Sequence, residues 1–169
     1  IACKDKHNLP KGQTFRKVHA YEGGTFKVTG PVVVHNVYAY WISVSCNHCV
    51  NAPCLTACPR GAMYKRTEDG LVLIDEERCT GCRNCLAVCP YQAPQFDTDT
   101  RKMKKCDFCQ DLLQEGKIPV CISACPMRVL SYGKLKELEK KYGQCKWVKG
   151  LPDTSKLEPA WVLLPHRDA

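Results

Sequence analysis

Residues 79–90 read Cys79-Thr80-Gly81-Cys82-Arg83-Asn84-Cys85-Leu86-Ala87-Val88-Cys89-Pro90. Their four cysteines are separated by gaps of two, two and three residues, and a proline follows the last cysteine. A cubane of four irons needs one thiolate per iron, and two-residue gaps let one short loop reach three of its corners. In this spacing the fourth cysteine ligates a neighbouring cubane, so the stretch predicts a pair of iron–sulfur clusters.

Two further sets of four cysteines flank this one and also end in Cys-Pro, so the chain contains three such ladders. The first ladder comprises Cys46, Cys49, Cys54 and Cys58, and the third comprises Cys106, Cys109, Cys121 and Cys125. Proline fixes its own φ and lacks a backbone N–H, so we expect the chain to turn away after each ladder. Cys3 resembles the last cysteine of a fourth ladder that begins before Ile1, which predicts that this chain is an N-terminally truncated fragment.

The crossing of each fourth cysteine suggests a ligand set for every cluster. We assign cluster A to Cys46, Cys49, Cys54 and Cys89, cluster B to Cys79, Cys82, Cys85 and Cys58, and cluster C to Cys106, Cys109, Cys121 and Cys3. Cys125 would belong to an incomplete cluster D. Cys145 lies outside every ladder and is expected to be an unligated thiol. The sequence therefore predicts three fully ligated 4Fe-4S clusters here and four in a full-length chain.

Composition agrees with a chain that is organised by metal. Its 169 residues are only 44% hydrophobic by a count that includes the cysteines, so the organic core is thin. Ligand bonds that form only in the folded state contribute to folding, and we expect the chain without metal to be largely unfolded. The formal net charge is +8 with every cysteine neutral. Ligating thiolates and cluster cores would bring it to about +2, so the basic excess does not predict a nucleic-acid partner.

Periodicity predicts few regular elements. A β-branched and aromatic run predicts a strand over residues 31–41, and a second short strand is expected at 71–74. Helical spacing of Leu135, Leu138 and Tyr142 predicts an amphipathic helix over residues 131–142. Short helical segments are expected after the third cysteine of each ladder. The apolar stretch at 161–164 is too short to cross a bilayer, and no direct membrane span is predicted.

Several polar residues near the ladders have two interpretations. Among the basic residues that lie within three positions of a predicted ligand are Arg60, Arg78, Arg83, Lys105 and Arg128. Positive charge there would favour a reduced cluster and raise its potential, but each side chain is equally compatible with ordinary solvation. His48 could donate to a cluster sulfur, although we expect a surface histidine that is not a ligand.

Beyond the ladders, the residues between and around the cysteines resemble a known family. The matching segments are Ile1-Ala2-Cys3-Lys4-Asp5, Cys46-Asn47-His48-Cys49, Gly61-Ala62-Met63, Cys79-Thr80-Gly81-Cys82-Arg83, Cys89-Pro90-Tyr91, Lys105-Cys106-Asp107 and residues 121–126. In these the chain resembles the iron–sulfur subunits of anaerobic dimethyl sulfoxide reductases. Those subunits belong to a wider group of four-cluster ferredoxin-like subunits that serve molybdopterin oxidoreductases.

This resemblance implies an α+β fold of two ferredoxin-like domains, with one domain inserted in the other. Each domain would bind two 4Fe-4S clusters. Residues 1–42 and 98–132 would form the outer domain, whose first ladder is incomplete. Residues 43–97 would form the inner domain. Residues 133–169 would form a C-terminal helix and docking tail.

The resemblance also implies a function. Such subunits carry electrons from a quinol-oxidising membrane anchor subunit to a molybdopterin-containing catalytic subunit, and are not enzymes by themselves. The implied location is at a membrane through a partner subunit, on the extracytoplasmic face or alternatively the cytoplasmic one. A related subunit of a polysulfide, tetrathionate or formate system has the same implied chemistry.

Three other classes remain as alternatives. A free polyferredoxin would use the same clusters, but the long flanks outside residues 46–125 favour a subunit with permanent partners. A zinc-binding structural module matches the Cys-x2-Cys pairs, yet three closely spaced thiolates before a Cys-Pro are not a zinc pattern. A secreted disulfide scaffold is compatible with the even count of 14 cysteines, but the ladders place thiols too close together for separate bridges.

Overall fold

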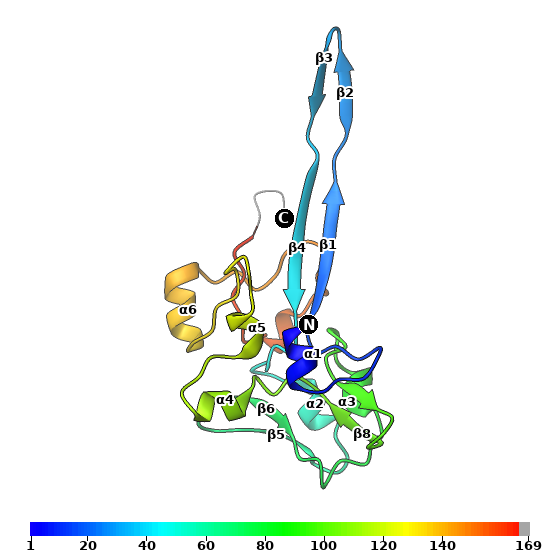
Figure 1. The fold of residues 1–169 in the computed structure, drawn as a ribbon, viewed down its shortest axis with the longest axis vertical. Coiled ribbons are helices and arrows are strands. Elements are labelled where there is room, and N and C mark those ends of the chain that lie inside the picture. Colours follow the sequence, from blue (N-terminus) through cyan, green and yellow to red (C-terminus); the bar gives the residue numbers. More distant parts are fainter. Residues whose placement is uncertain (166–169) are drawn as a thin grey trace.

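A long β-hairpin arm projects from a body of short helices and small hairpins (Figure 1). This computed structural model describes residues 1–165. At the base of the arm, β1 (Lys17–Gly23) pairs antiparallel with β4 (Tyr38–Val44), and Lys17 lies opposite Val44. At its tip, β2 (Phe26–Thr29) pairs with β3 (Val32–His35).

The strand predicted over residues 31–41 is present but is interrupted within the arm. The side-chain Oδ1 of Asn36 accepts a hydrogen bond from the backbone N–H of Thr25 at 2.7 Å, while the Asn36 N–H donates to the Thr25 carbonyl at 3.2 Å. A side-chain oxygen thus takes the place of one backbone acceptor between the two strand pairs. Gly24 has a φ of +97°, and a Cβ at this position would collide with the carbonyl oxygen of Asn36. The break between β3 and β4 therefore follows from a side-chain bond and a glycine that neither the valines nor the tyrosines of the run reveal.

The body is mixed α and β with small sheets. Its two hairpins pair β5 (Met63–Lys65) with β6 (Val72–Ile74), and β7 (Gln95–Asp97) with β8 (Lys102–Lys104). Its helices are α1 (Ala2–Lys6), α2 (Pro53–Thr56), α3 (Asn84–Ala87), α4 (Gln110–Gln114), α5 (Val120–Ser123), α6 (Leu135–Tyr142) and a 3-10 turn at Ser155–Leu157. The strand predicted at 71–74 is confirmed as β6. The helix predicted over residues 131–142 is confirmed over Leu135–Tyr142, and residues 131–134 are not helical.

Two apolar clusters hold these elements together. One lies at the base of the arm and contains Tyr40, Ile42, Val44, Val148 and Leu151. The other contains Ala52, Met63, Val72, Cys85 and Met103, and predicted ligand cysteines pack against it. The second cluster is thus built around the sulfur atoms.

The C-terminal segment folds back onto the first ladder. Backbone N–H groups of Val50 and Asn51 donate to the carbonyls of Glu158 and Leu157 at 2.8 and 3.1 Å, and Ala160 N–H donates to Asn47. This tail therefore covers the loop that carries Cys46 and Cys49. Among residues 1–165, every helix is too short or too polar to cross a membrane.

Candidate metal centre

The three Cys-Pro ladders share one local structure. Helices α2, α3 and α5 are each four residues long and begin one residue before the third cysteine of a ladder. After each fourth cysteine, its carbonyl accepts a hydrogen bond from the residue three positions later, at 3.0–3.2 Å. That later residue, Gly61, Gln92 or Arg128, has a positive φ. The predicted turn after each ladder is present, and the short helix contains the third cysteine instead of following it.

This turn aims backbone N–H groups at the sulfur of the fourth cysteine. Ala62 N–H donates to the Cys58 sulfur at 3.2 Å, and Ala93 N–H donates to the Cys89 sulfur at 3.5 Å. Burial alone would raise the pKa of Cys58, but hydrogen bonds from the four residues that follow Pro59 outweigh it and lower that pKa. Cys125 is arranged in the same way, with donors from residues 127–130 lowering its pKa against burial. The loops after Cys58 and Cys125 are suited to hold a thiolate, whereas at Cys89 burial outweighs the backbone donors and raises the pKa.

Four cysteines from two ladders line one pocket, and we name them tetrad B: Cys58, Cys79, Cys82 and Cys85. Met103 N–H from β8 donates to the Cys79 sulfur at 3.4 Å. Burial, followed by repulsion from Cys79 and Cys82, raises the pKa of Cys85 to about 11. Gly81 has a φ of +70°, and a Cβ there would collide with the carbonyl oxygen of Arg101, so the loop of the middle ladder packs directly on the β7–β8 hairpin.

A second group, tetrad A, consists of Cys46, Cys49, Cys54 and Cys89. Burial, followed by repulsion from the Cys46 thiolate, raises the pKa of Cys49 to about 11 and that of Cys54 to about 12. Cys89 acts electrostatically on the same two thiols. The last cysteine of the middle ladder therefore lies with the first three cysteines of the first ladder.

A second pocket contains tetrad C: Cys3, Cys106, Cys109 and Cys121. Arg16 lines this pocket. Its guanidinium donates to Ser43 and Ser45, and its buried Nε has no hydrogen-bond partner among the described residues. Burial, followed by repulsion from Cys46, raises the pKa of Cys106 to about 12. Tetrad C therefore adjoins tetrad A. Sequence reasoning missed Arg16, because this residue is distant in the sequence from Cys106, Cys109 and Cys121. In the fold it directly precedes β1 and lies beside tetrad C.

The chemistry of these sulfur sets fits iron–sulfur clusters. Each tetrad brings four thiols together, and in each of them burial and repulsion from other thiolates raise the pKa of at least one thiol. A bound cation would compensate that accumulated charge. All fourteen cysteines lie within residues 1–165 and are free, so none forms a disulfide there. The grouping is the one expected from the crossing of fourth cysteines, but ligation itself stays a prediction.

Two cysteines lie outside the tetrads. Cys125 is buried, and the structure brings no second set of three cysteines to it within residues 1–165. Cys145 packs against the apolar cluster at the base of the arm, and its Sγ donates to the carbonyl of Trp147 at 3.1 Å. These positions are compatible with the predicted roles of an incomplete ligand set and a free thiol.

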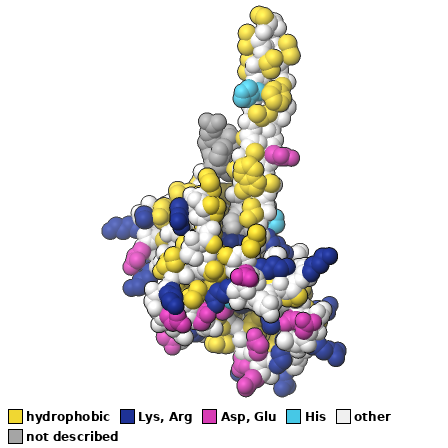
Figure 2. All heavy atoms as spheres, viewed as in Figure 1, with side chains coloured by type: hydrophobic (Ala, Val, Ile, Leu, Met, Phe, Trp, Pro, Cys, Tyr) yellow, Lys and Arg dark blue, Asp and Glu magenta, His cyan; other side chains and the backbone are white. Residues whose placement is uncertain are grey.

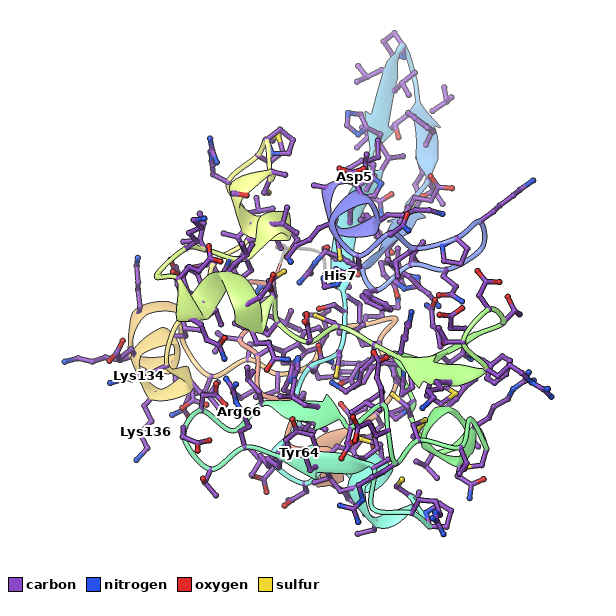
Figure 3. The ribbon with its side chains drawn as sticks, turned by 60° about the horizontal axis from the view of Figure 1, so that its bottom comes forward. Asp5, His7, Tyr64, Arg66, Lys134 and Lys136 are labelled. Atoms are coloured by element: carbon purple, nitrogen blue, oxygen red, sulfur yellow. The ribbon has the colours of Figure 1, made fainter. Side chains whose placement is uncertain are left out.

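His7 lies beside tetrad C and was not singled out from the sequence. Its Nε2 lies 3.9 Å from the Cys109 sulfur and 3.6 Å from Asp107 Oδ1. Figure 3 shows His7 below α1, on the side of that helix that faces the body. Because Cys109 already belongs to tetrad C, we interpret His7 as a neighbour of that tetrad and not as a ligand of a separate metal site.

The expectation that His48 is a surface residue is wrong. The residue is only 5% exposed, its Nδ1 accepts the backbone N–H of Val72 at 3.0 Å, and its Nε2 has no hydrogen-bond partner within residues 1–165. Burial, followed by the positive charge of Lys105, holds the pKa of His48 well below its usual range. The Cys-x2-Cys loop bends at His48, whose φ is +42°, and turns the ring inward.

Comparisons with known proteins point to one family. The 4Fe-4S dicluster domain family matches residues 37–135. Over 169 residues the protein is 43% identical to the chain designated B of the anaerobic dimethyl sulfoxide reductase of Escherichia coli (strain K12), covering 100% of this chain and 82% of the relative. It is 38% identical over 142 residues to a thiosulfate reductase electron transfer subunit of Salmonella typhi, covering 82% and 69%. It is 43% identical over 100 residues to the dimethylsulfide dehydrogenase subunit beta of Rhodovulum sulfidophilum, covering 59% and 31%.

Proposed function

Because this protein belongs to the 4Fe-4S dicluster family and groups with a chain of the anaerobic dimethyl sulfoxide reductases, we propose that it passes electrons to a molybdopterin-containing catalytic subunit. The chain is an iron–sulfur electron-transfer subunit of a reductase complex and is not the catalyst. The observation that carries the proposal is the gathering of twelve cysteines into tetrads A, B and C.

Each tetrad is proposed to hold one 4Fe-4S cluster, and Cys125 to contribute to a fourth in a chain with the remaining ladder. When bound, such a cluster accepts and releases one electron at a time. The crossing of Cys58 and Cys89 between the first two ladders supports an inner ferredoxin-like domain over residues 43–97. The meeting of Cys3 with the third ladder supports an outer domain formed by residues 1–42 and 98–132, into which the inner domain is inserted.

The tetrads have an order that suits conduction. Tetrads A and B share one apolar cluster, in which Ala52 from the first ladder packs with Cys85 from the middle one. Cys46 of tetrad A acts electrostatically on Cys106 of tetrad C. Tetrad A therefore lies between the other two, and the chain supplies cysteine sulfur from one end of this series to the other.

The proposed partners are a catalytic subunit and a membrane anchor subunit that oxidises quinol. The names of the relatives describe chains and subunits of reductases and dehydrogenases, which supports assembly with a catalytic partner. We place the chain at a membrane through the anchor, on the extracytoplasmic face, with the cytoplasmic face as the alternative.

We assign the arm to contact with the catalytic subunit. Hydrophobic side chains cover much of its upper part (Figure 2), and Val28 and Phe26 of β2 are 77% and 67% exposed. A two-stranded hairpin is marginally stable in water by itself, and exposed apolar patches of this kind mark protein interfaces. Lys27 is the one Lys, Arg, Asp or Glu from Gly23 to Tyr38, whereas attraction to an anionic membrane surface takes clusters of about 4–8 basic residues.

The function is tested by isolating the complex without oxygen and adding a reduced quinol analogue. Electron paramagnetic resonance should show reduced 4Fe-4S signals, and addition of a sulfoxide substrate should reoxidise them. Signals that quinol does not produce, in a complex whose clusters dithionite does reduce, would overturn the proposed direction of transfer. Isolation of the chain as a stable monomer would favour a free polyferredoxin.

A further inference from the structure

Lys105 is a buried cation at the start of the third ladder. The residue is 5% exposed, and in the sequence it links the end of β8 to Cys106. Its ammonium group donates to the carbonyl of Val72 and, at 2.9 Å, to the carbonyl of Cys106. Both partners are neutral backbone groups.

This buried charge has no acidic partner among the described residues. The ion pairs within residues 1–165 do not include Lys105. Taking an ammonium group out of water is expensive unless an opposite charge compensates it, and two carbonyl dipoles supply no net charge. The surroundings of Lys105 therefore require a negative charge that the side-chain carboxylates do not provide.

Val72 is where the loops of tetrads A and C meet around this lysine. The carbonyl of Val72 accepts from Lys105, and its N–H donates to His48, which lies between Cys46 and Cys49 of tetrad A. Cys106 of tetrad C is the next residue after Lys105. Cys49 and Cys54 of tetrad A pack against the apolar cluster that contains Val72.

We propose that Lys105 is a counter-cation shared by the clusters of tetrads A and C, and that it raises the reduction potential of both. The inference rests on the proposed function, since it assumes that the tetrads hold clusters. A reduced cluster carries one more negative charge than an oxidised one, so a fixed positive charge in a medium of low dielectric stabilises the reduced state. Lys105 would thus keep two adjacent clusters reducible by the same donor.

The other basic residues near the ladders are placed differently. Arg60, Arg78, Arg83 and Arg128 are all exposed, and Arg83 stacks over the Phe96 ring with 4.1 Å between Cζ and the ring centroid. Water and salt screen such charges. Of the five basic residues singled out from the sequence, Lys105 alone is buried. Its charge is therefore the one least screened by water and salt.

The test compares Lys105→Met, Lys105→Gln and Lys105→Arg in the assembled complex, with redox titrations followed by electron paramagnetic resonance. Lys136→Met is the matched control, because Lys136 extends from α6 into solvent (Figure 3). In the two neutral variants, the ratio of reduced to oxidised cluster at a fixed potential should fall about tenfold for tetrads A and C, which is ~59 mV for a one-electron couple. Lys105→Arg and Lys136→Met should leave the ratio near the wild-type value, and tetrad B should shift least.

Iron and sulfide analysis of each variant separates the possible outcomes. Full iron with unshifted potentials in both neutral variants would overturn the inference, as would an equal shift in Lys136→Met. Loss of iron from both neutral variants, with retention in Lys105→Arg, would support a required charge. Loss from all three variants would overturn it, because the lysine would then act only by its shape. Wild-type complex without iron and sulfide would instead refute the proposed function.

Discussion

The backbone N–H of Val72 donates to Nδ1 of His48 over 3.0 Å, within a buried environment. The neutral imidazole must therefore carry its proton on Nε2, which has no partner within residues 1–165. This bond ties the Cys46–Cys49 loop to β6.

Replacement His48→Phe keeps a ring at this position but removes the acceptor for Val72. A buried N–H without a partner costs about 1–3 kcal/mol, so we expect the variant to lose its clusters faster in denaturant. Bleaching of the visible absorbance measures this rate. His19→Phe is the control, because His19 is exposed on β1. A bleaching rate in His48→Phe equal to that of the wild type would show that this bond does not hold the loop.

Gly81→Ala should prevent assembly of the cluster at tetrad B. The added Cβ would collide with the carbonyl oxygen of Arg101, and the φ of +70° disfavours a residue with a side chain. We expect about four fewer irons per chain. Gly30→Ala is the matched control, since Gly30 has a φ of +61° at the arm tip and nothing within 4 Å of the position that its added methyl group would take. Full iron content in Gly81→Ala would contradict the packing of this loop on the β7–β8 hairpin.

A polar arm tip should weaken assembly and leave the clusters intact. Val28 and Val33 lie opposite each other on one face of the tip, so the double change to Ser removes apolar contact area from one patch. We expect co-purification of the catalytic subunit to fall at least several-fold while iron content stays at the wild-type level. Ile118→Ser, which changes an exposed apolar residue outside both the arm and the C-terminal tail, should leave assembly unchanged. Selective loss of membrane binding or of self-association would assign the tip to a different occupant.

Cys145→Ala should retain every cluster, whereas Cys85→Ser should lose about four irons. The thiol of Cys145 donates to the Trp147 carbonyl and packs on apolar side chains, whereas Cys85 lines the pocket of tetrad B. Iron analysis of both variants beside the wild type makes the comparison. A loss of iron from Cys145→Ala equal to that from Cys85→Ser would make Cys145 a ligand.

Short-range patterns in this chain were predictable, and long-range placements were not. The spacing of each ladder predicted a turn after Cys58, Cys89 and Cys125, because proline and a two-residue gap restrict the backbone locally. The break at Asn36 depends on a side-chain bond to Thr25 across the hairpin, and the burial of His48 depends on β6, which is distant in the sequence. The sequence also ranks Lys105 equally with the arginines near the ladders, since only packing of β6 against the third ladder excludes water from it.

The proposed function depends on cysteine sulfur atoms that hold iron–sulfur clusters. Iron and acid-labile sulfide measured on anaerobically purified protein test whether they do. We predict about twelve irons and about twelve sulfides per chain of this length, with reduced 4Fe-4S resonances after dithionite. Folded protein that contains zinc or no metal, lacks labile sulfide and gives no resonance after dithionite would contradict the account.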